Sequence, residues 1–151
     1  AHIARFLMEH GYVTQMSEAF DRYLSPGCPY YIEREKVTPQ MAVSLIASTG
    51  GIPVLAHPML YHLSDTQLKE LILALKPLGL MGIEAVYSTY SEEETAYVRN
   101  LAYETDLCLS GGSDFHGANK PGLDLGCGYG QLTVPYEFLD RLRERRQHYE
   151  H

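Results

Sequence analysis

The pattern of hydrophobic and polar residues divides the chain into a helical first part and a mixed second part. Apolar residues recur at helical spacing over residues 3–10 and 17–24. Thr38-Pro39 then predicts the start of another helix, because a threonine cap followed by proline is typical of a helix N-terminus. We therefore expect a helical unit over residues 1–37 and a second unit over residues 38–151.

Three short apolar runs in the second part predict buried β-strands. They cover residues 52–56, 82–86 and 107–110, and helices with cap signals at Ser64 and Ser91 lie between them. Strands that alternate with helices at this spacing are typical of βαβ units with parallel strands. We therefore predict an α/β fold with a parallel sheet, in which three strands are too few to close a barrel on their own.

Metal-binding side chains follow the first and third predicted strands directly. His57 comes after the first strand, and Asp114 and His116 come after the third, behind Gly111 and Gly112, which permit close approach of backbone or ligand. The carboxyl ends of parallel strands form one rim, where functional loops converge. If the backbone stays extended from Asp114 to His116, both side chains point to the same side and can share a cation. The sequence therefore predicts a metal site, and two imidazoles with a carboxylate suit Mn, Fe or Zn.

Other side chains near these strand ends have two interpretations each. His62 could reach the site or lie on the surface, and Ser113 could hold a ligand carboxylate or stabilise a turn. Tyr87 and Tyr90 could stack on a nucleobase or pack at the rim of the core. Glu84 lies on the second strand, and we assign it no metal-bridging role.

Composition narrows the possible functions. The formal net charge of −7 argues against binding an extended nucleic-acid duplex through a broad basic surface. The three cysteines form no Cys-x-x-Cys pair, so we expect reduced thiols in a cytoplasmic protein. No apolar run approaches the roughly 20 residues that cross a bilayer. The chain lacks an initiator Met and begins as if inside a helix, without the features of a signal peptide, so we expect a fragment.

Several motifs resemble those of the PHP (polymerase and histidinol phosphatase) family of metal-dependent phosphoesterases. Leu55-Ala56-His57-Pro58 and Gly112-Ser113-Asp114-Phe115-His116 are similar to the last two metal-binding motifs of that family. The run Gly82-Ile83-Glu84-Ala85-Val86 resembles its Gly-hydrophobic-Glu strand. His2-Ile3-Ala4-Arg5 resembles the start of a helix in stand-alone bacterial members, which insert a small helical subdomain into the barrel.

The resemblance implies a particular fold and an incomplete set of ligands. Residues 38–151 would be the C-terminal portion of a distorted (β/α)7 barrel with parallel strands, and residues 1–37 part of the inserted helical subdomain. The family's first motif, a His-x-His pair followed by an Asp, is absent, and so are its next His and its bridging Glu. The chain therefore carries a minority of the ligands of a complete site.

The resemblance also implies an activity. The complete site would hold two or three divalent metal ions, Mn, Fe or Zn, with His57, Asp114 and His116 as ligands and catalytic residues. The expected reaction is hydrolysis of phosphate esters of small nucleotides or oligonucleotide ends. His2 and Arg5, one turn apart on the opening helix, are the candidates for binding the substrate phosphate.

Two other interpretations stay open on the sequence alone. The chain could be a truncated, catalytically incompetent fragment that acts only as a structural or weak metal-binding piece, and its exposed barrel edge could drive self-association. It could also be a metallohydrolase of the amidohydrolase type. That class usually has an isolated Asp after its last strand, so the Asp114-x-His116 pair argues against it.

Overall fold

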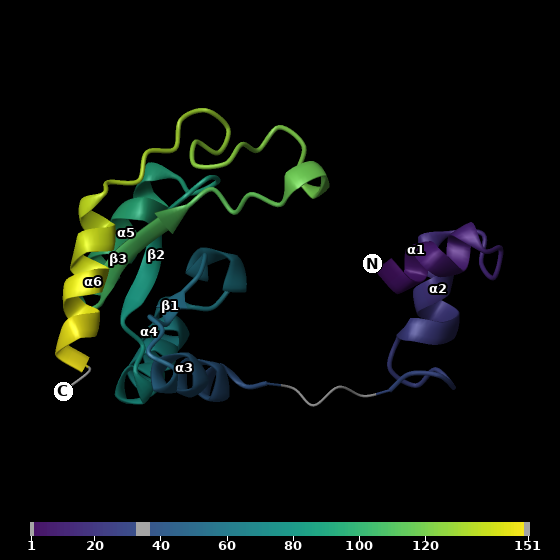
Figure 1. Ribbon diagram of the computed structural model, residues 1–151, viewed down its shortest axis with the longest axis horizontal. Helices are drawn as coiled ribbons and strands as arrows, with labels where there is room; N and C mark the ends of the chain where they lie inside the picture. Colours follow the sequence, from purple (N-terminus) through teal and green to yellow (C-terminus); the bar gives the residue numbers. More distant parts are fainter. Residues whose placement is uncertain (1, 33–36, 150–151) are drawn as a thin grey trace. The chain divides into compact units, whose positions relative to one another are not determined.

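The chain forms two compact units, residues 1–36 and 37–151, of which the computed structural model describes residues 2–32 and 37–149 (Figure 1). The first unit is helical. It contains α1 (His2–Glu9), α2 (Met16–Ala19) and a π-helical turn, η1 (Phe20–Leu24). Its small core is formed by three buried residues, Ala4, Val13 and Ala19.

The second unit alternates helices and strands as predicted. Its elements, in order, are α3 (Pro39–Ser48), β1 (Val54–Leu55), the 3-10 turn η2 (Pro58–Tyr61), α4 (Asp65–Leu75), η3 (Lys76–Leu78), β2 (Gly82–Tyr87), α5 (Glu92–Glu104), β3 (Cys108–Gly112), η4 (Gly117–Asn119) and α6 (Glu137–Tyr149). The predicted caps are confirmed. The Thr38 hydroxyl accepts a hydrogen bond from the Met41 N–H, and Ser64 and Ser91 each form a capping box.

The strands form one parallel sheet in the order β1-β2-β3. The predicted parallel α/β arrangement is therefore confirmed, but none of the three predicted strand ranges was exact, and those of β1 and β3 differ most. β1 is only two residues long, because Pro53 has no N–H and contributes only its carbonyl, which accepts hydrogen bonds from Met81 and Gly82. β3 continues beyond Ser110 to Gly112, since the glycines keep pairing with β2 across a register shift.

The core of the second unit lies between the sheet and its helices. Ile83 and Ala85 on β2 are fully buried and pack with apolar side chains of α4 and α5, among them Ile72 and Val98. On the other flank, α6 lies beside β3 (Figure 1). This packing fixes the three strands relative to one another, and therefore also the loops at their carboxyl ends.

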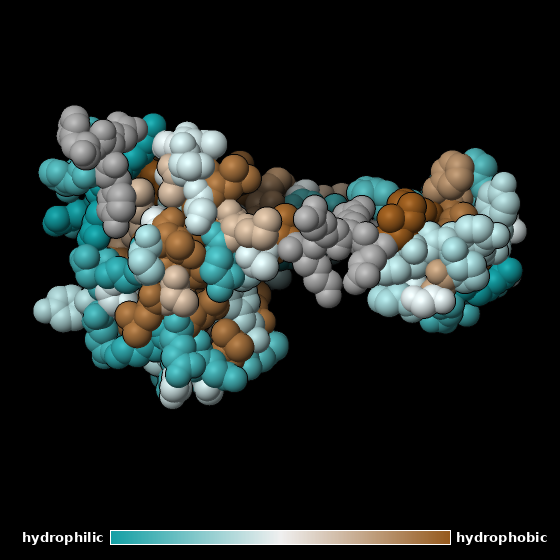
Figure 2. Space-filling view, turned by 90° about the horizontal axis from the view of Figure 1, so that it is seen from below, coloured by the Kyte–Doolittle hydropathy of each residue, from teal (hydrophilic) through white to brown (hydrophobic). Residues whose placement is uncertain are grey.

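Hydrophobic side chains also reach the surface of each unit, as Figure 2 shows by their brown colour. In the second unit Leu45, Leu73 and Leu125 are more than half exposed. None of the helices among the described residues is long and apolar enough to cross a membrane.

Candidate metal centre

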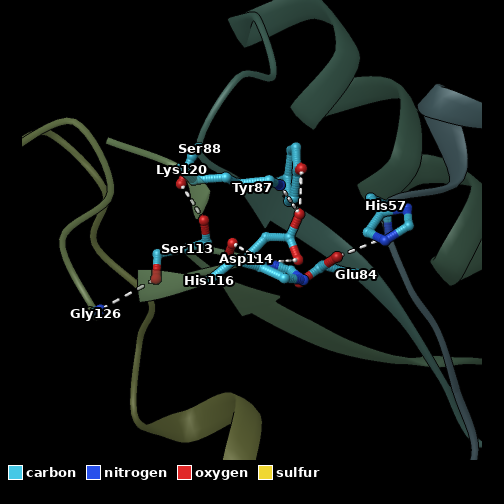
Figure 3. Close-up of polar contacts among 9 residues, drawn as sticks. All are labelled: His57, Glu84, Tyr87, Ser88, Ser113, Asp114, His116, Lys120 and Gly126. Atoms are coloured by element: carbon cyan, nitrogen blue, oxygen red, sulfur yellow. Dashed lines mark hydrogen bonds and ion pairs between the residues drawn. The ribbon is translucent and has the colours of Figure 1, made fainter. Parts of the chain in front are cut away.

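The three predicted ligands of the second unit lie near one another at the carboxyl end of the sheet (Figure 3). His57 follows β1, and Asp114 and His116 follow β3. The His116 Nδ1 atom is 3.4 Å from the Asp114 Oδ1 atom. Tyr87, the last residue of β2, links the two strand ends. Its ring centroid is 5.6 Å from that of His57, and its hydroxyl donates a 2.8 Å hydrogen bond to Asp114 Oδ2.

The backbone at Asp114 is not extended, so that part of the prediction was wrong. Asp114 has a φ of 56°, in the left-handed region, because β3 ends at Gly112 and the chain turns immediately afterwards. The turn brings the His116 Nδ1 atom to 2.7 Å from the carbonyl oxygen of Asp114. Asp114 and His116 therefore come together through a turn rather than through the alternation of a strand.

Asp114 has two hydrogen-bond donors at the same oxygen. Besides Tyr87, the ammonium of Lys120 donates to Asp114 Oδ2 and forms an ion pair with it. The pKa of Asp114 is lowered below its ordinary value, first by the hydrogen bond from Lys120 and then by that from Tyr87. The hydrogen bond to Asp114 in turn raises the pKa of Lys120. The carboxylate is therefore held ionised, with a cation already beside it.

His57 is held in an unusual backbone conformation. Its φ is 31°, which is uncommon for a residue with a side chain, and its backbone N–H donates a 2.7 Å hydrogen bond to Glu84 Oε2. The His57 Nδ1 atom is buried and has no hydrogen-bond partner among the described residues. A buried polar atom without a partner is costly and calls for an explanation, such as a ligand that the structure does not contain.

Glu84 contributes a second carboxylate at the sheet end. Burial raises its pKa above the ordinary value, and the hydrogen bond from His57 lowers it only in part. The other oxygen of Glu84 faces β3, where a Cβ added at Gly112 would lie 3.2 Å from Oε1. Gly112 thus gives the carboxylate room between the strands, as the glycine pair in the sequence suggested.

Ser113 stabilises the loop through two hydrogen bonds. Its hydroxyl accepts a 3.2 Å hydrogen bond from the Gly126 N–H, and its carbonyl accepts a 2.9 Å hydrogen bond from the Ser88 hydroxyl. Of its two interpretations, the structural role is the one that the contacts support. His62 is exposed beyond η2.

His2 and Arg5 belong to the first unit, where both are exposed on α1. Their predicted role with phosphate is therefore not tested by any contact of the second unit, and it stays a prediction.

The donors present suit a divalent metal, but they do not form a complete site. The buried, unpartnered His57 Nδ1, the nearby imidazole of His116 and the two carboxylates are ligand types that bind Mn, Fe or Zn. Yet within the part of the chain that the structure describes, no group of three or more His, Cys, Asp or Glu residues is arranged to hold a metal ion. The assignment of His57, Asp114 and His116 as ligands stays a prediction.

Sequence reasoning missed Lys120 and placed Glu84 on its strand without a role in this cluster. Lys120 lies in the loop after β3, six residues beyond Asp114. Nothing in the sequence pattern of a loop indicates that these two side chains pair. Glu84 had a clearer signal, because a carboxylate in the middle of an otherwise apolar strand needs a partner when it is buried. Its partner is the backbone of His57, a contact between residues that are 27 positions apart.

Several known proteins are similar to this chain in sequence. A 3′,5′-nucleoside bisphosphate phosphatase from Chromobacterium violaceum is 35% identical over 125 residues, which are 83% of this chain and 44% of that protein. A 5′-3′ exoribonuclease from Haemophilus influenzae is 34% identical over 140 residues, 93% of this chain and 48% of that protein. The chain thus spans a little under half the length of these curated relatives. No family model matches the chain.

Solved structures agree with these matches. The structure of an amidohydrolase from Chromobacterium violaceum, with bound sulfate and no metal, has a TM-score of 0.62 and 32% identity, and the match covers 95% of this chain and 50% of that one. A protein from Bifidobacterium adolescentis that is described as a metal-dependent phosphoesterase has a TM-score of 0.62 and 30% identity, with coverages of 95% and 49%.

The fold and these matches define the class of protein. The chain has an α/β fold with a parallel sheet of the kind found in amidohydrolase-like and phosphoesterase proteins. Over the matched residues, the resemblance to PHP-type phosphoesterases that the sequence motifs indicated is confirmed.

Proposed function

We propose that this chain supplies part of the active site of a metal-dependent phosphoesterase that hydrolyses phosphate esters of small nucleotides or oligonucleotide ends. The observation that carries the proposal is the meeting of His57, Asp114 and His116 at the carboxyl end of a parallel sheet. The substrate class rests on the relatives, which are named as a nucleoside bisphosphate phosphatase and exoribonucleases.

In the proposed whole protein, residues 38–151 form the C-terminal portion of a distorted (β/α)7 barrel, and residues 1–37 belong to an inserted helical subdomain. The coverage of only half of each solved neighbour supports a portion of a larger fold, and the two compact units, residues 1–36 and 37–151, support the division. The outer edges of β1 and β3 have no strand partner among the described residues, so these edges would pair with further strands or with a second copy. Three free cysteines support a cytoplasmic location.

The proposed chemistry uses each residue of the cluster differently. Two or three Mn, Fe or Zn ions would polarise the phosphate and activate a water molecule. His57 and His116 would bind through neutral imidazole nitrogens, and Asp114 through a carboxylate that its neighbours keep ionised. Tyr87 orients Asp114, and Glu84 fixes the backbone of His57. On the first unit, His2 and Arg5 would bind the substrate phosphate.

The test is metal content in the unaltered chain and in the His57→Ala and Asp114→Ala variants, all purified without added metal, and activity in the proposed whole protein with the same substitutions. His148→Ala is the matched control, because His148 is exposed on α6. We expect both site variants to lose bound Mn, Fe or Zn and to hydrolyse a nucleoside 3′,5′-bisphosphate at least about a hundredfold more slowly, while the control is unchanged. Metal retained in both site variants would refute the ligand assignment.

The alternative, a structural or weak metal-binding piece, has one observation in its favour. The described residues contain no group arranged to hold a metal ion. If the unaltered chain binds no metal and elutes as an oligomer in size-exclusion chromatography with light scattering, this alternative holds for the chain.

A further inference from the structure

A pocket of about 500 Å³ in the second unit is formed by three elements: the end of β2, helix α5 and the loop after β3. The loop packs directly against β2, because Gly128 is buried and a Cβ added there would lie 2.6 Å from the Ser88 Oγ atom. The Ser88 hydroxyl in turn donates a hydrogen bond to the carbonyl of Ser113, at the start of the same loop (Figure 3). The pocket therefore has fixed walls and a volume that suits a small organic ligand.

The polar side chains that line this pocket differ in whether they have partners. The hydroxyls of Tyr87, Ser88 and Tyr90, at and just beyond the end of β2, each form a hydrogen bond within the unit. The polar side chains that α5 and the loop contribute form no hydrogen bond or ion pair among the described residues, and they are Thr95, Arg99, Tyr129, Gln131 and Thr133. Polar groups that line one cavity and are left without partners are typical of a ligand site.

The charge of the lining favours an anion. Among the described residues that line the pocket, Arg99 is the only charged one, although the chain as a whole has a formal net charge of −7. A second pocket, of about 490 Å³ between α4 and α5, shows the contrast. Three carboxylates line it, and its ammonium, that of Lys69, is paired with Glu104. The first pocket thus has an unpaired cation and no carboxylate that would repel an anion.

Arg99 is held in place without being neutralised. Its guanidinium carbon lies 5.4 Å from the centroid of the Phe138 ring, in a cation–π contact. Phe138 is only 9% exposed, so its ring is a fixed support. This contact leaves the N–H groups of the guanidinium available, and a guanidinium can bind phosphate oxygens through two parallel hydrogen bonds. The cation of the pocket therefore suits a phosphate group.

We propose that this pocket binds a small phosphate monoester of about nucleotide size, with its phosphate on Arg99 and the rest of the molecule against the polar side chains of the loop. A free phosphate ion would fill only a small part of the volume and would leave those side chains without partners. The site is separate from the candidate metal centre, since none of His57, Asp114 and His116 lines it. It requires no metal ion, so it goes beyond the proposed function and does not depend on it.

The test is a calorimetric titration of the chain with adenosine 5′-monophosphate in the presence of a chelator. We expect the unaltered chain to bind it, and Arg99→Met to bind it at least about tenfold more weakly, because the charged hydrogen bonds to phosphate are lost. Adenosine, which has no phosphate, should bind at least about tenfold more weakly to the unaltered chain. No binding by the unaltered chain, or equal binding by Arg99→Met, overturns the proposal. Inorganic phosphate that binds as tightly as the monoester would refute the ligand class.

Two further variants separate this role from a general loss of charge or of structure. Arg141→Met removes the same charge from α6, where Arg141 pairs with Glu137, and it should change the affinity by no more than about twofold. If Arg99→Met does not fold, the exposed loop carries the test. The double variant Gln131→Ala/Thr133→Val should then bind the monoester about fivefold more weakly, and an unchanged affinity would refute the proposal.

The position of the ligand is measured by NMR. On addition of adenosine 5′-monophosphate to the metal-free chain, the backbone amides of Arg99 and Gln131 should show the largest changes in chemical shift. Changes confined to His57 and His116 would place the ligand at the candidate metal centre and refute a separate pocket. Because the chelator removes metal throughout, these results stand apart from the metal analysis that tests the proposed function.

Discussion

The end of β1 and the end of β3 meet at the same candidate centre, yet their polar groups are satisfied in different ways. After β3, one oxygen of the Asp114 carboxylate accepts hydrogen bonds from both Tyr87 and Lys120. After β1, His57 is fixed through its backbone by Glu84, while its Nδ1 atom is buried without a partner. The carboxylate after β3 thus has a cation beside it, whereas the imidazole after β1 has a buried nitrogen without a hydrogen-bond partner among the described residues. The difference teaches that the polar groups at one edge of a sheet can be stabilised in two ways, by side-chain partners at Asp114 and by a backbone hydrogen bond at His57.

The largest effect is expected at Gly111 of β3, which lies directly against Val86 of β2 just before the strand ends that carry the candidate centre. A Cβ at Gly111 would lie 2.8 Å from the Cβ and carbonyl oxygen of Val86, so Gly111→Ala must push the strands apart. We expect it to lower the free energy of unfolding by about 3 kcal/mol. Urea unfolding followed by circular dichroism measures this.

Gly112→Ala is the matched control for that prediction. Its added Cβ would meet only the Oε1 atom of Glu84, at 3.2 Å, and a carboxylate at the end of a side chain can move. The expected loss is below about 1 kcal/mol. Equal losses in the two variants would show that the approach of β2 and β3 is not what limits the packing here.

The next largest effect on stability is expected from the hydrogen bond between Glu84 and the His57 N–H, after β1. Glu84→Ala removes the acceptor of the His57 N–H, and we expect a loss of about 2 kcal/mol in the free energy of unfolding, since an unsatisfied N–H is costly. Glu84→Gln retains an oxygen at the same place and should lose less than about 1 kcal/mol. Both are measured by urea unfolding of the metal-free protein. A Gln variant as unstable as the Ala variant would mean that the charge matters more than the hydrogen bond.

Smaller effects are expected from two tyrosines, Tyr87 at the end of β2 and Tyr90 just beyond it. The Tyr87 hydroxyl donates to Asp114, and the Tyr90 hydroxyl accepts a 3.1 Å hydrogen bond from the Met59 N–H, in the turn after His57. Tyr87→Phe and Tyr90→Phe should each lower the free energy of unfolding by about 1 kcal/mol. Hydrogen exchange of the Met59 amide should accelerate, by about fivefold, in Tyr90→Phe alone. Acceleration in both variants would mean that the segments after β1 and β3 undergo local unfolding together.

The parts of this arrangement that could be predicted from the sequence are those with local causes. The caps at Ser64 and Ser91 depend on residues three positions apart, and the order of strands and helices depends on apolar runs, so both were predictable. The pairing of Lys120 with Asp114 and of Glu84 with His57 was not. Such pairs depend on how a loop turns or on contacts between distant positions, and a linear pattern of residues contains neither. The turn at Asp114 belongs to the same group, since nothing in an Asp-x-His motif requires a positive φ.

The smallest expected effect is on the pH dependence of stability in the metal-free protein, where Asp114 and Glu84 act in opposite directions. The pKa of Asp114 lies below its ordinary value of 3.8, mainly because Lys120 donates to it. Its stabilising contribution is therefore present above pH 3.8 and is lost as the pH falls through the folded-state pKa. The pKa of Glu84 lies above its ordinary value of 4.5, mainly because it is buried. Its contribution is present below pH 4.5 and is lost as the pH rises through the folded-state pKa.

Carbon-13 NMR titration of the two side-chain carboxyls, with a chelator present, measures both pKa values directly. Urea unfolding across the same pH range then compares the unaltered protein with Asp114→Asn and Glu84→Gln. In Asp114→Asn, the free energy of unfolding should decline less as the pH falls below 3.8 than in the unaltered protein. In Glu84→Gln, it should decline less as the pH rises above 4.5. Since both carboxyls lie at one sheet end, shifts in the same direction would mean that a shared environment controls them. Opposite shifts would mean that the immediate surroundings of each carboxyl set its charge, through Lys120 at Asp114 and through burial at Glu84.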